Sequence, residues 1–99
     1  MAQQAVKIRW TPIAAEDLRS VHDFIAEQSP PQADKVIDRI LEAVDLLERY
    51  PQMGRPGRVE GTRELVIAGT AFLVVYRIHR DQVHILSILH ASRKWPDNF

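Results

Sequence analysis

The stretch AFLVVYRIHRDQVHILSILH, residues 71–90, decides the fold. It consists of two runs of strand length that are rich in β-branched and aromatic residues. The polar pair Arg80-Asp81 lies between the runs and leaves a connection short enough for an antiparallel hairpin. A third run precedes them across a short Gly-containing turn. The sequence therefore predicts three consecutive antiparallel strands at 62–67, 71–79 and 82–90.

Both faces of the predicted hairpin are apolar. Along 71–78 the two alternating sets of side chains are both apolar as far as Arg77. In the final strand, strict alternation assigns Val83, Ile85 and Leu89 to one face. The opposite face then receives His84, Leu86, Ile88 and His90. A sheet that is apolar on both faces needs cover on both, so we expect a partner chain over one face, unless strand twist and the 51–61 loop cover it.

Two amphipathic helices precede the three strands. Thr11 followed by Pro12 is typical of a helix start, and so is Ser29 followed by Pro30. Gln32 lies three residues after Ser29 and completes a capping-box pattern. Apolar residues recur at helical spacing after each start, and Tyr50-Pro51 ends the second helix. The short connection between the helices predicts an antiparallel helix hairpin.

One strand opens the chain, and a loop links the helices to the later strands. Residues 5–10 alternate apolar and polar side chains, as a half-buried strand does. Residues 52–58 are rich in glycine and proline, which indicates a loop. The predicted fold class is therefore α+β in the order β-α-α-β-β-β. The helix hairpin is expected to pack on one face of a small, mostly antiparallel sheet.

Length and composition restrict the class of protein. A chain of 99 residues has the size of one domain, spanning 1–99, and its 45% apolar and 26% charged content is ordinary for a globular fold. The absence of cysteine excludes disulfides and thiolate zinc sites. No apolar run reaches the roughly 20 residues that span a bilayer, and Met1-Ala2-Gln3-Gln4 does not begin a signal peptide. We expect a cytoplasmic protein with no membrane contact, no metal and no cofactor.

The formal net charge of zero hides a division between the two halves of the chain. Residues 1–50 carry six basic and nine acidic side chains, whereas residues 51–99 carry seven basic and four acidic ones. Segregated charge of this kind indicates that the C-terminal half meets an anionic partner, although differences of three charges also arise by chance.

Several short runs in the second half resemble one toxin family. They are Tyr50-Pro51-Gln52-Met53-Gly54-Arg55, Gly61-Thr62-Arg63-Glu64-Leu65, Val74-Val75-Tyr76-Arg77-Ile78, and Ile85-Leu86-Ser87-Ile88-Leu89-His90 leading to Arg93-Lys94-Trp95-Pro96. In this order and at this spacing they resemble the RelE/ParE superfamily of toxins from type II toxin–antitoxin systems. The resemblance extends from about Val6 to Pro96, and no single run is specific on its own.

The resemblance implies partners. It implies a cognate antitoxin whose flexible segment wraps and neutralises the toxin, in keeping with the apolar face that needs cover. It also implies that the complex represses its own promoter, with operator DNA contacted only through the antitoxin. The near-neutral charge of this chain agrees with DNA binding by the antitoxin rather than by the toxin.

One branch of the family cleaves messenger RNA on the ribosome. Cleavage beside a 2′-hydroxyl needs a base, an acid and cations that stabilise the pentavalent phosphate. His90, Arg63 and Arg77 are the catalytic candidates that this branch implies, and they would work without metal. Candidates for contact with a target are Arg55, Arg58, Arg93, Lys94 and Trp95.

Each candidate also has a structural explanation. Arg63 and Arg77 are charged residues near strand ends that could pair with Glu64 or Glu60. His90 fits a hydrogen-bonded histidine of the strand, and Trp95 fits packing at an edge better than base stacking. Arg93 and Lys94 fit a solvated tail.

One departure separates this chain from the ribonuclease branch. That branch typically places a basic residue in the central strand a few residues before its aromatic residue, where this chain has Phe72-Leu73-Val74. The pattern is more similar to the ParE branch, which poisons DNA gyrase and blocks replication. We therefore expect a plasmid-stabilising toxin that inhibits gyrase. The alternatives are a messenger-RNA endoribonuclease and a degenerate toxin that only binds its antitoxin.

Overall fold

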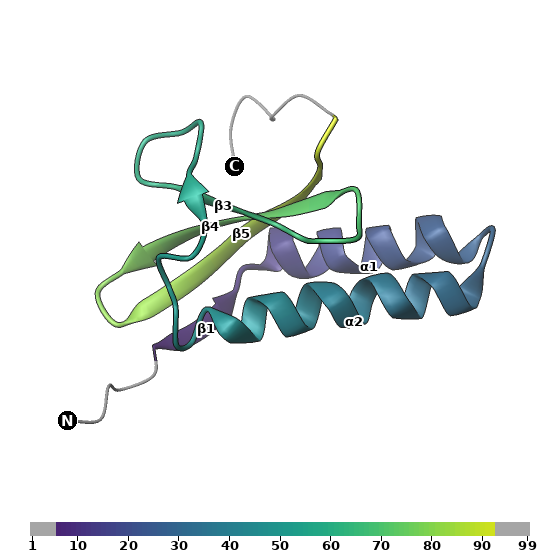
Figure 1. Ribbon diagram of the computed structural model, residues 1–99, viewed down its shortest axis with the longest axis horizontal. Coiled ribbons are helices and arrows are strands. Elements are labelled where there is room, and N and C mark those ends of the chain that lie inside the picture. Colours follow the sequence, from purple (N-terminus) through teal and green to yellow (C-terminus); the bar gives the residue numbers. More distant parts are fainter. Residues whose placement is uncertain (1–5, 93–99) are drawn as a thin grey trace.

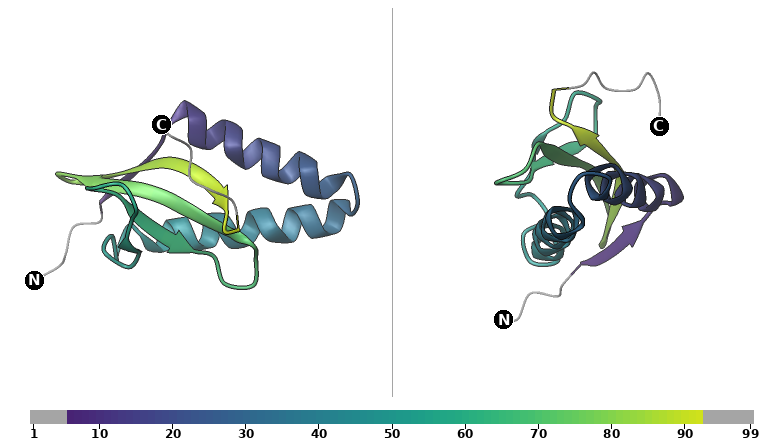
Figure 2. Two further views of the ribbon diagram at one scale, coloured as in Figure 1. Left: turned by 90° about the horizontal axis from the view of Figure 1, so that it is seen from above. Right: turned by 90° about the vertical axis from the view of Figure 1, so that its right-hand side faces the viewer.

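The computed structural model describes residues 6–92 of the chain. Their secondary structure runs in the order β1 (Lys7–Trp10), α1 (Pro12–Ala26), α2 (Pro30–Leu46), β2 (Arg55–Pro56), β3 (Arg63–Val66), β4 (Phe72–His79) and β5 (Gln82–His90). The strands form one sheet in the order β1-β5-β4-β3-β2, in which β1 is parallel to β5 and the other neighbours are antiparallel. The two helices lie together on one face of this sheet (Figures 1 and 2). The predicted fold class is confirmed.

One strand was not expected from the sequence. Residues 52–58 were predicted to be a loop, but Arg55 pairs with Glu64 and Pro56 with Arg63, which makes β2 a two-residue edge strand. A strand this short leaves no alternating pattern, and the neighbouring glycine and proline residues hide it. Apart from β2, the predicted strands agree with the observed ones to within two residues at each end.

The helix starts follow the sequence signals. The Thr11 hydroxyl accepts a hydrogen bond from Ala14 N at 3.2 Å, and the Ser29 hydroxyl accepts one from Gln32 N at 3.3 Å. The amide of Ser29 donates to Ile25 O at 2.9 Å, so the preceding helix already satisfies the group that a capping-box glutamine would bind. Neither helix is long and apolar enough to cross a membrane.

The core lies between the helices and the sheet. Ile40, Val44 and Leu47, in and directly after α2, are 0–1% exposed, and so are Val74 and Tyr76 of β4. Burying a large apolar side chain contributes about 1.5–3 kcal/mol, so these residues dominate the stability of so small a domain.

A β-bulge in β5 changes the expected faces of the last strand. Val75 pairs with Ser87 and Tyr76 with Ile85, which leaves Leu86 as an extra residue. Because the extra residue switches the alternation, Ile88 joins Val83 and Ile85 in the core cluster. The prediction that Ile88 and His90 face away from Val83 is therefore wrong, since strict alternation cannot reveal an inserted residue.

Helix α1 holds the bulged part of β5 in place. The chain turns from β1 into α1 at Thr11, whose amide and hydroxyl both donate to Ile85 O, at 3.1 and 2.7 Å. Beyond that point Asp17 Oδ2 accepts hydrogen bonds from Ser87 Oγ at 2.7 Å and from Ile88 N at 3.0 Å. The carboxylate thus satisfies a backbone donor that β1 is too short to reach, and the helix covers the strand edge.

The sheet face away from the helices is less exposed to solvent than the sequence indicates. Leu73 and Val75 of β4 point away from the helices, yet they are only 2% and 0% exposed. The single chain therefore buries these two residues without a partner. The expectation of a partner cannot rest on them.

The Tyr76 hydroxyl joins β4 to the segment after α2. It donates to Pro51 O at 2.7 Å and accepts from Gly54 N at 2.8 Å. Burial raises the pKa of Tyr76, and the hydrogen bond from Gly54 opposes that rise. Any side chain at Gly54 would collide with the ring, because an added Cβ would lie 2.7 Å from the Tyr76 oxygen.

We predict that Tyr76→Phe lowers the free energy of unfolding by about 1–3 kcal/mol, because it leaves a buried amide and a carbonyl without partners. Urea denaturation followed by circular dichroism measures this change. Tyr50→Phe is the matched control, since Tyr50 is 59% exposed and its loss of a hydroxyl should change little. Equal midpoints for the two variants would contradict the role of the Tyr76 hydroxyl.

We also predict a pH-dependent contact between the two helices. His22 of α1 binds Asp34 of α2 at 3.2 Å and Asp23 at 3.5 Å, and these hydrogen bonds raise its pKa above 6.5. The added stability is full below pH 6.5 and is lost as the pH rises through the raised pKa. The difference in unfolding midpoint between the wild-type chain and His22→Gln should therefore shrink from about pH 6 to about pH 8. A difference that grows with pH would refute this assignment.

Candidate functional site

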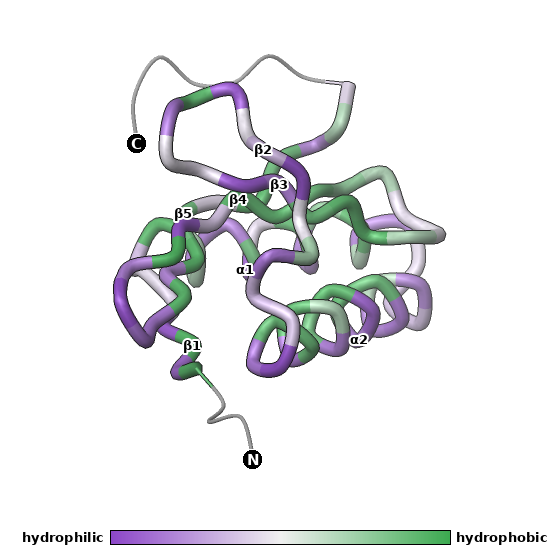
Figure 3. Tube along the Cα trace, turned by 60° about the vertical axis from the view of Figure 1, so that its left-hand side comes forward, coloured by the Kyte–Doolittle hydropathy of each residue, from purple (hydrophilic) through white to green (hydrophobic). Residues whose placement is uncertain are grey.

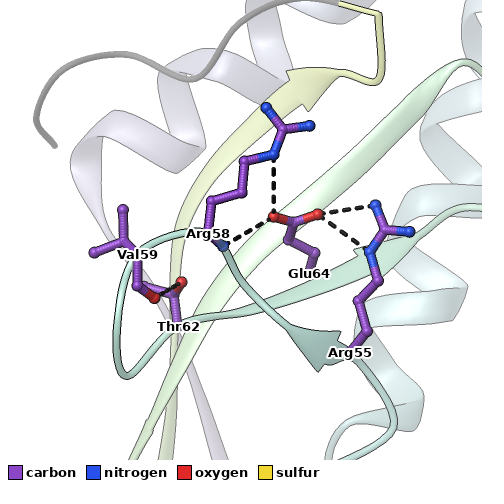
Figure 4. A network of polar contacts seen from close by, with 5 residues as sticks. All are labelled: Arg55, Arg58, Val59, Thr62 and Glu64. Carbon is purple, nitrogen blue, oxygen red and sulfur yellow. Dashed lines mark hydrogen bonds and ion pairs between the residues drawn. The ribbon is translucent and has the colours of Figure 1, made fainter.

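The sheet face opposite the helices contains a buried carboxylate between two arginines. Glu64 of β3 is 3% exposed, and its Oε1 accepts from Arg55 Nη2 at 2.9 Å and from Arg55 Nε at 3.2 Å. Its Oε2 accepts from the backbone N of Arg58 at 3.3 Å and forms an ion pair with Arg58 Nε at 3.8 Å. Figure 4 shows the two guanidinium groups on either side of the carboxylate.

Local pairing explains this arrangement. Arg55 lies opposite Glu64 in the β2–β3 ladder, so both side chains project from the same face. The loop between the strands is closed by Gly57 N donating to Thr62 O at 2.8 Å and by Thr62 Oγ1 donating to Val59 O at 2.6 Å. This closure brings Arg58 back over Glu64.

Two predicted target-binding residues are thus brought together. The side chains of Arg55 and Arg58 are 59% and 52% exposed, whereas Glu64 is buried beneath them. The carboxylate orients both guanidinium groups and cancels one of their two charges. The remaining guanidinium donors of Arg55 suit a carboxylate or a phosphate on a partner.

The three catalytic candidates do not converge. Arg63 pairs with Tyr76 on the helix side of β3, and its Nη1 donates to Gly54 O at 2.7 Å and to Gln52 O at 3.3 Å. Arg77 is exposed on the opposite face. Arg63 therefore fixes the loop before β2 and does not pair with Glu64 or Glu60.

His90 lies at the other end of the sheet from Arg77. It pairs with Phe72, whereas Arg77 pairs with His84, which separates the two by roughly 15 Å along β4. The His90 ring packs edge-to-face on Phe72 with centroids 5.5 Å apart, and its Nδ1 lies 2.7 Å from Ser92 Oγ. The other predicted contact residues, Arg93, Lys94 and Trp95, lie outside the described residues.

A shallow apolar hollow is lined by α1 and the ends of β4 and β5. The residues that line this hollow are Asp17, Ser20, Val21, Phe24, Phe72, Ile88, Leu89 and His90. Among them, Phe24 is 64% exposed. His90 is thus part of an apolar surface, and the residues within 6–92 that line the hollow with it include no cation. Residues 6–92 contain no group of three or more histidine, aspartate or glutamate side chains placed to hold a metal ion.

The helix hairpin on a mostly antiparallel sheet, with an arginine-flanked open face, is the architecture of a small toxin of the RelE/ParE type. The family described as the ParE toxin of the type II toxin–antitoxin system parDE matches residues 8–95. The chain belongs to this family and is the toxin of a type II toxin–antitoxin system.

Relatives and solved structures agree with this assignment. A putative toxin, Y4kP, of Sinorhizobium fredii is 46% identical over 91% of this chain and 93% of its own length. Toxin RelE2 of Caulobacter vibrioides is 34% identical over 88% of this chain and 97% of its own. A chain of the chromosomal ParDE system of P. aeruginosa superposes with a TM-score of 0.80 at 28% identity, covering 91% of this chain and all of that one. A chain of the RelBE2 toxin–antitoxin complex of Mycobacterium tuberculosis gives 0.64 at 26% identity, covering 87% and 98%.

Sequence reasoning missed the central role of Glu64. Arg55 and Glu64 are nine residues apart, and only the short β2–β3 ladder makes them neighbours. The sequence around Glu64 does not show which arginine pairs with it, because Arg63 is its direct neighbour in the same strand.

We predict that Glu64→Gln lowers the free energy of unfolding by about 1–3 kcal/mol, because the buried acceptor loses its charge and binds the two arginines less tightly. The effect should lie toward the lower end, since solvent screens the half-exposed guanidinium groups. Thermal denaturation measures the change. Glu60→Gln is the control, because Glu60 is exposed on the loop between β2 and β3. A loss of the same size in the control would show a general charge effect.

Proposed function

We propose that this toxin arrests growth by inhibiting DNA gyrase and that a cognate antitoxin neutralises it. The observation that carries the choice of target is the position of Leu73. Its side chain lies on the face away from the helices. The family resemblance implies a basic residue at this place in the ribonuclease branch. The neighbouring residue of β4 on this face is Val75, so at these two positions β4 itself offers no cation to a scissile phosphate.

The separation of the catalytic candidates supports the same choice. Metal-independent cleavage needs an acid, a base and a cation within hydrogen-bonding reach of one phosphate. Arg63 is bound to backbone carbonyls, Arg77 lies on the opposite face, and His90 packs edge-to-face on Phe72 at the far end. Inhibition through a binding surface requires no such convergence.

A ribosome-dependent endoribonuclease remains the second candidate. Arg55, whose side chain is 59% exposed, presents outward donors that would suit messenger RNA. A relative with 34% identity is called toxin RelE2, and one similar structure is a RelBE2 complex. Names of both branches therefore occur among the proteins that this chain is similar to. A degenerate toxin that only binds its antitoxin is the third possibility to be tested.

The antitoxin part of the proposal rests on the similar structures. One is a ParDE toxin–antitoxin system and another is a toxin–antitoxin complex. The exposed Phe24 beside the hollow on α1 would suit an apolar segment of such a partner. We further propose that this partner supplies the contacts to operator DNA and that the toxin acts in the cytoplasm.

Induction of the chain alone in bacteria distinguishes the three functions. DNA-damage response and messenger-RNA integrity are followed in the same culture, with Ile40→Asp as an unfolded control. That substitution buries an unpaired charge in the core, because Ile40 is 0% exposed. We predict growth arrest with a DNA-damage response and intact transcripts for the wild-type chain only.

Other results would contradict gyrase as the target. Cleaved ribosome-bound transcripts without DNA damage would identify a nuclease. Normal growth at a protein level equal to that of an active relative would identify a degenerate toxin. Suppression of the arrest by the neighbouring antitoxin gene tests neutralisation separately from the target.

A further inference from the structure

Two cross-strand rows of polar side chains lie at the end of the sheet near the β4–β5 turn. Lys7 of β1 pairs with Gln82 of β5, which pairs with His79 of β4. One step further, Arg9 pairs with His84, which pairs with Arg77. We call the six residues Lys7, Arg9, Arg77, His79, Gln82 and His84 the basic grid.

The basic grid lies on the face away from the helices. Its sequence neighbours Ile8, Trp10, Ile78, Val83 and Ile85 all belong to the core or pack against it. Side chains alternate along each strand, so the grid residues point to the opposite side. Figure 3 shows hydrophilic chain at the β4–β5 turn, close to β1.

The cations of the grid are not neutralised as Arg55 is. Lys7, Arg9 and Arg77 are exposed, and within residues 6–92 none of them makes an ion pair or a side-chain hydrogen bond. The grid itself contains no carboxylate. Its internal contacts are a 2.9 Å hydrogen bond between Gln82 Oε1 and His84 Nε2 and the His79 and His84 rings, whose centroids are 6.3 Å apart.

We propose that the basic grid binds the phosphodiester backbone of duplex DNA. Neighbouring strands lie about 4.8 Å apart and alternate residues about 7 Å apart, so the three cations span roughly 10 Å by 7 Å. DNA carries one charge per about 1.7 Å of helix axis, so a patch of this size meets several phosphates. This inference rests on gyrase as the proposed target, because gyrase holds the DNA duplex beside which the toxin would bind.

The composition of the grid favours DNA over an acidic protein surface. The centre of a protein–protein interface is depleted of charge and carries aromatic or apolar anchors. The grid has no apolar side chain, and its lysine, arginines and glutamine are typical contacts to phosphate oxygens. Such contacts position a protein on DNA without selecting a sequence, so operator recognition stays with the antitoxin.

Salt dependence gives the sharpest test. Three phosphate contacts predict a slope of about −2.7 for the logarithm of the binding constant against the logarithm of salt concentration. Fluorescence anisotropy of a labelled 20-base-pair duplex measures this slope with the purified chain, made by cell-free synthesis to avoid selection against the toxin. Replacing Lys7, Arg9 and Arg77 together by glutamine should bring the slope close to zero and abolish most of the binding.

The matched control is a triple glutamine variant at Arg19, Lys35 and Arg49, which lie exposed in or just after the helices and carry the same total charge. It should keep the wild-type slope. Equal slopes for the wild-type chain and the grid variant would overturn the proposal. Binding of single-stranded RNA at least tenfold tighter than the duplex would overturn the assignment to DNA.

A gyrase supercoiling assay separates this inference from the proposed function. If the wild-type chain binds the duplex through the grid but leaves supercoiling unchanged, gyrase is the wrong target and the DNA site stands. If the wild-type chain inhibits supercoiling and the grid variant inhibits it equally at every toxin concentration, the target stands and the grid plays no part in it. An increase of at least tenfold in the toxin concentration that the grid variant needs would support both.

Discussion

The bulge at Leu86, which the carboxylate of Asp17 holds in place, decides which side of the sheet the last residues of β5 face. Without the extra residue, Ile88 and His90 would point away from the helices. With it, Ile88 completes the core and His90 turns toward α1. Asp17 fixes this arrangement because it accepts the Ile88 amide and the Ser87 hydroxyl on an edge that β1 leaves unpaired. The side that the end of β5 presents to the helices depends on this single irregularity.

The open face divides into two basic surfaces with different electrostatics. Near β2, Glu64 lies under Arg55 and Arg58, orients them and cancels part of their charge. Near the β4–β5 turn, Lys7, Arg9 and Arg77 extend from the sheet without a carboxylate among them. Val75, which pairs with Glu64, is buried and apolar, and Leu73 is buried beyond it on the side away from the basic grid. A chain of zero net charge therefore offers a local positive field on one face, and a local field of this kind governs the approach of an anionic partner.

The same division bears on the choice of target within the family. Nucleolytic chemistry requires groups that meet at one phosphate, whereas the candidates of this chain are bound to backbone, exposed alone, or packed edge-to-face on an aromatic ring. Inhibition by a surface requires complementary shape and charge over a broad area. The exposed arginines and the apolar hollow on α1 lie on different sides of the domain. An antitoxin and a target can therefore be recognised by different surfaces of so small a protein.

The sequence by itself determined the order of elements, the helix hairpin and the family, because caps, helical stripes and alternation depend on residues close together in the chain. Thr11, Ser29 and the 71–90 stretch carried that information. Only the tertiary structure decided that β2 exists, that β5 is bulged, that Glu64 holds Arg55 and Arg58, and that β1 runs parallel to β5. The last pairing joins residues some 75 positions apart and places Arg9 beside His84, whose other neighbour is Arg77. A local sequence pattern does not predict such distant contacts, because many strand pairings satisfy the same alternation. Packing of the whole chain selects one of these pairings.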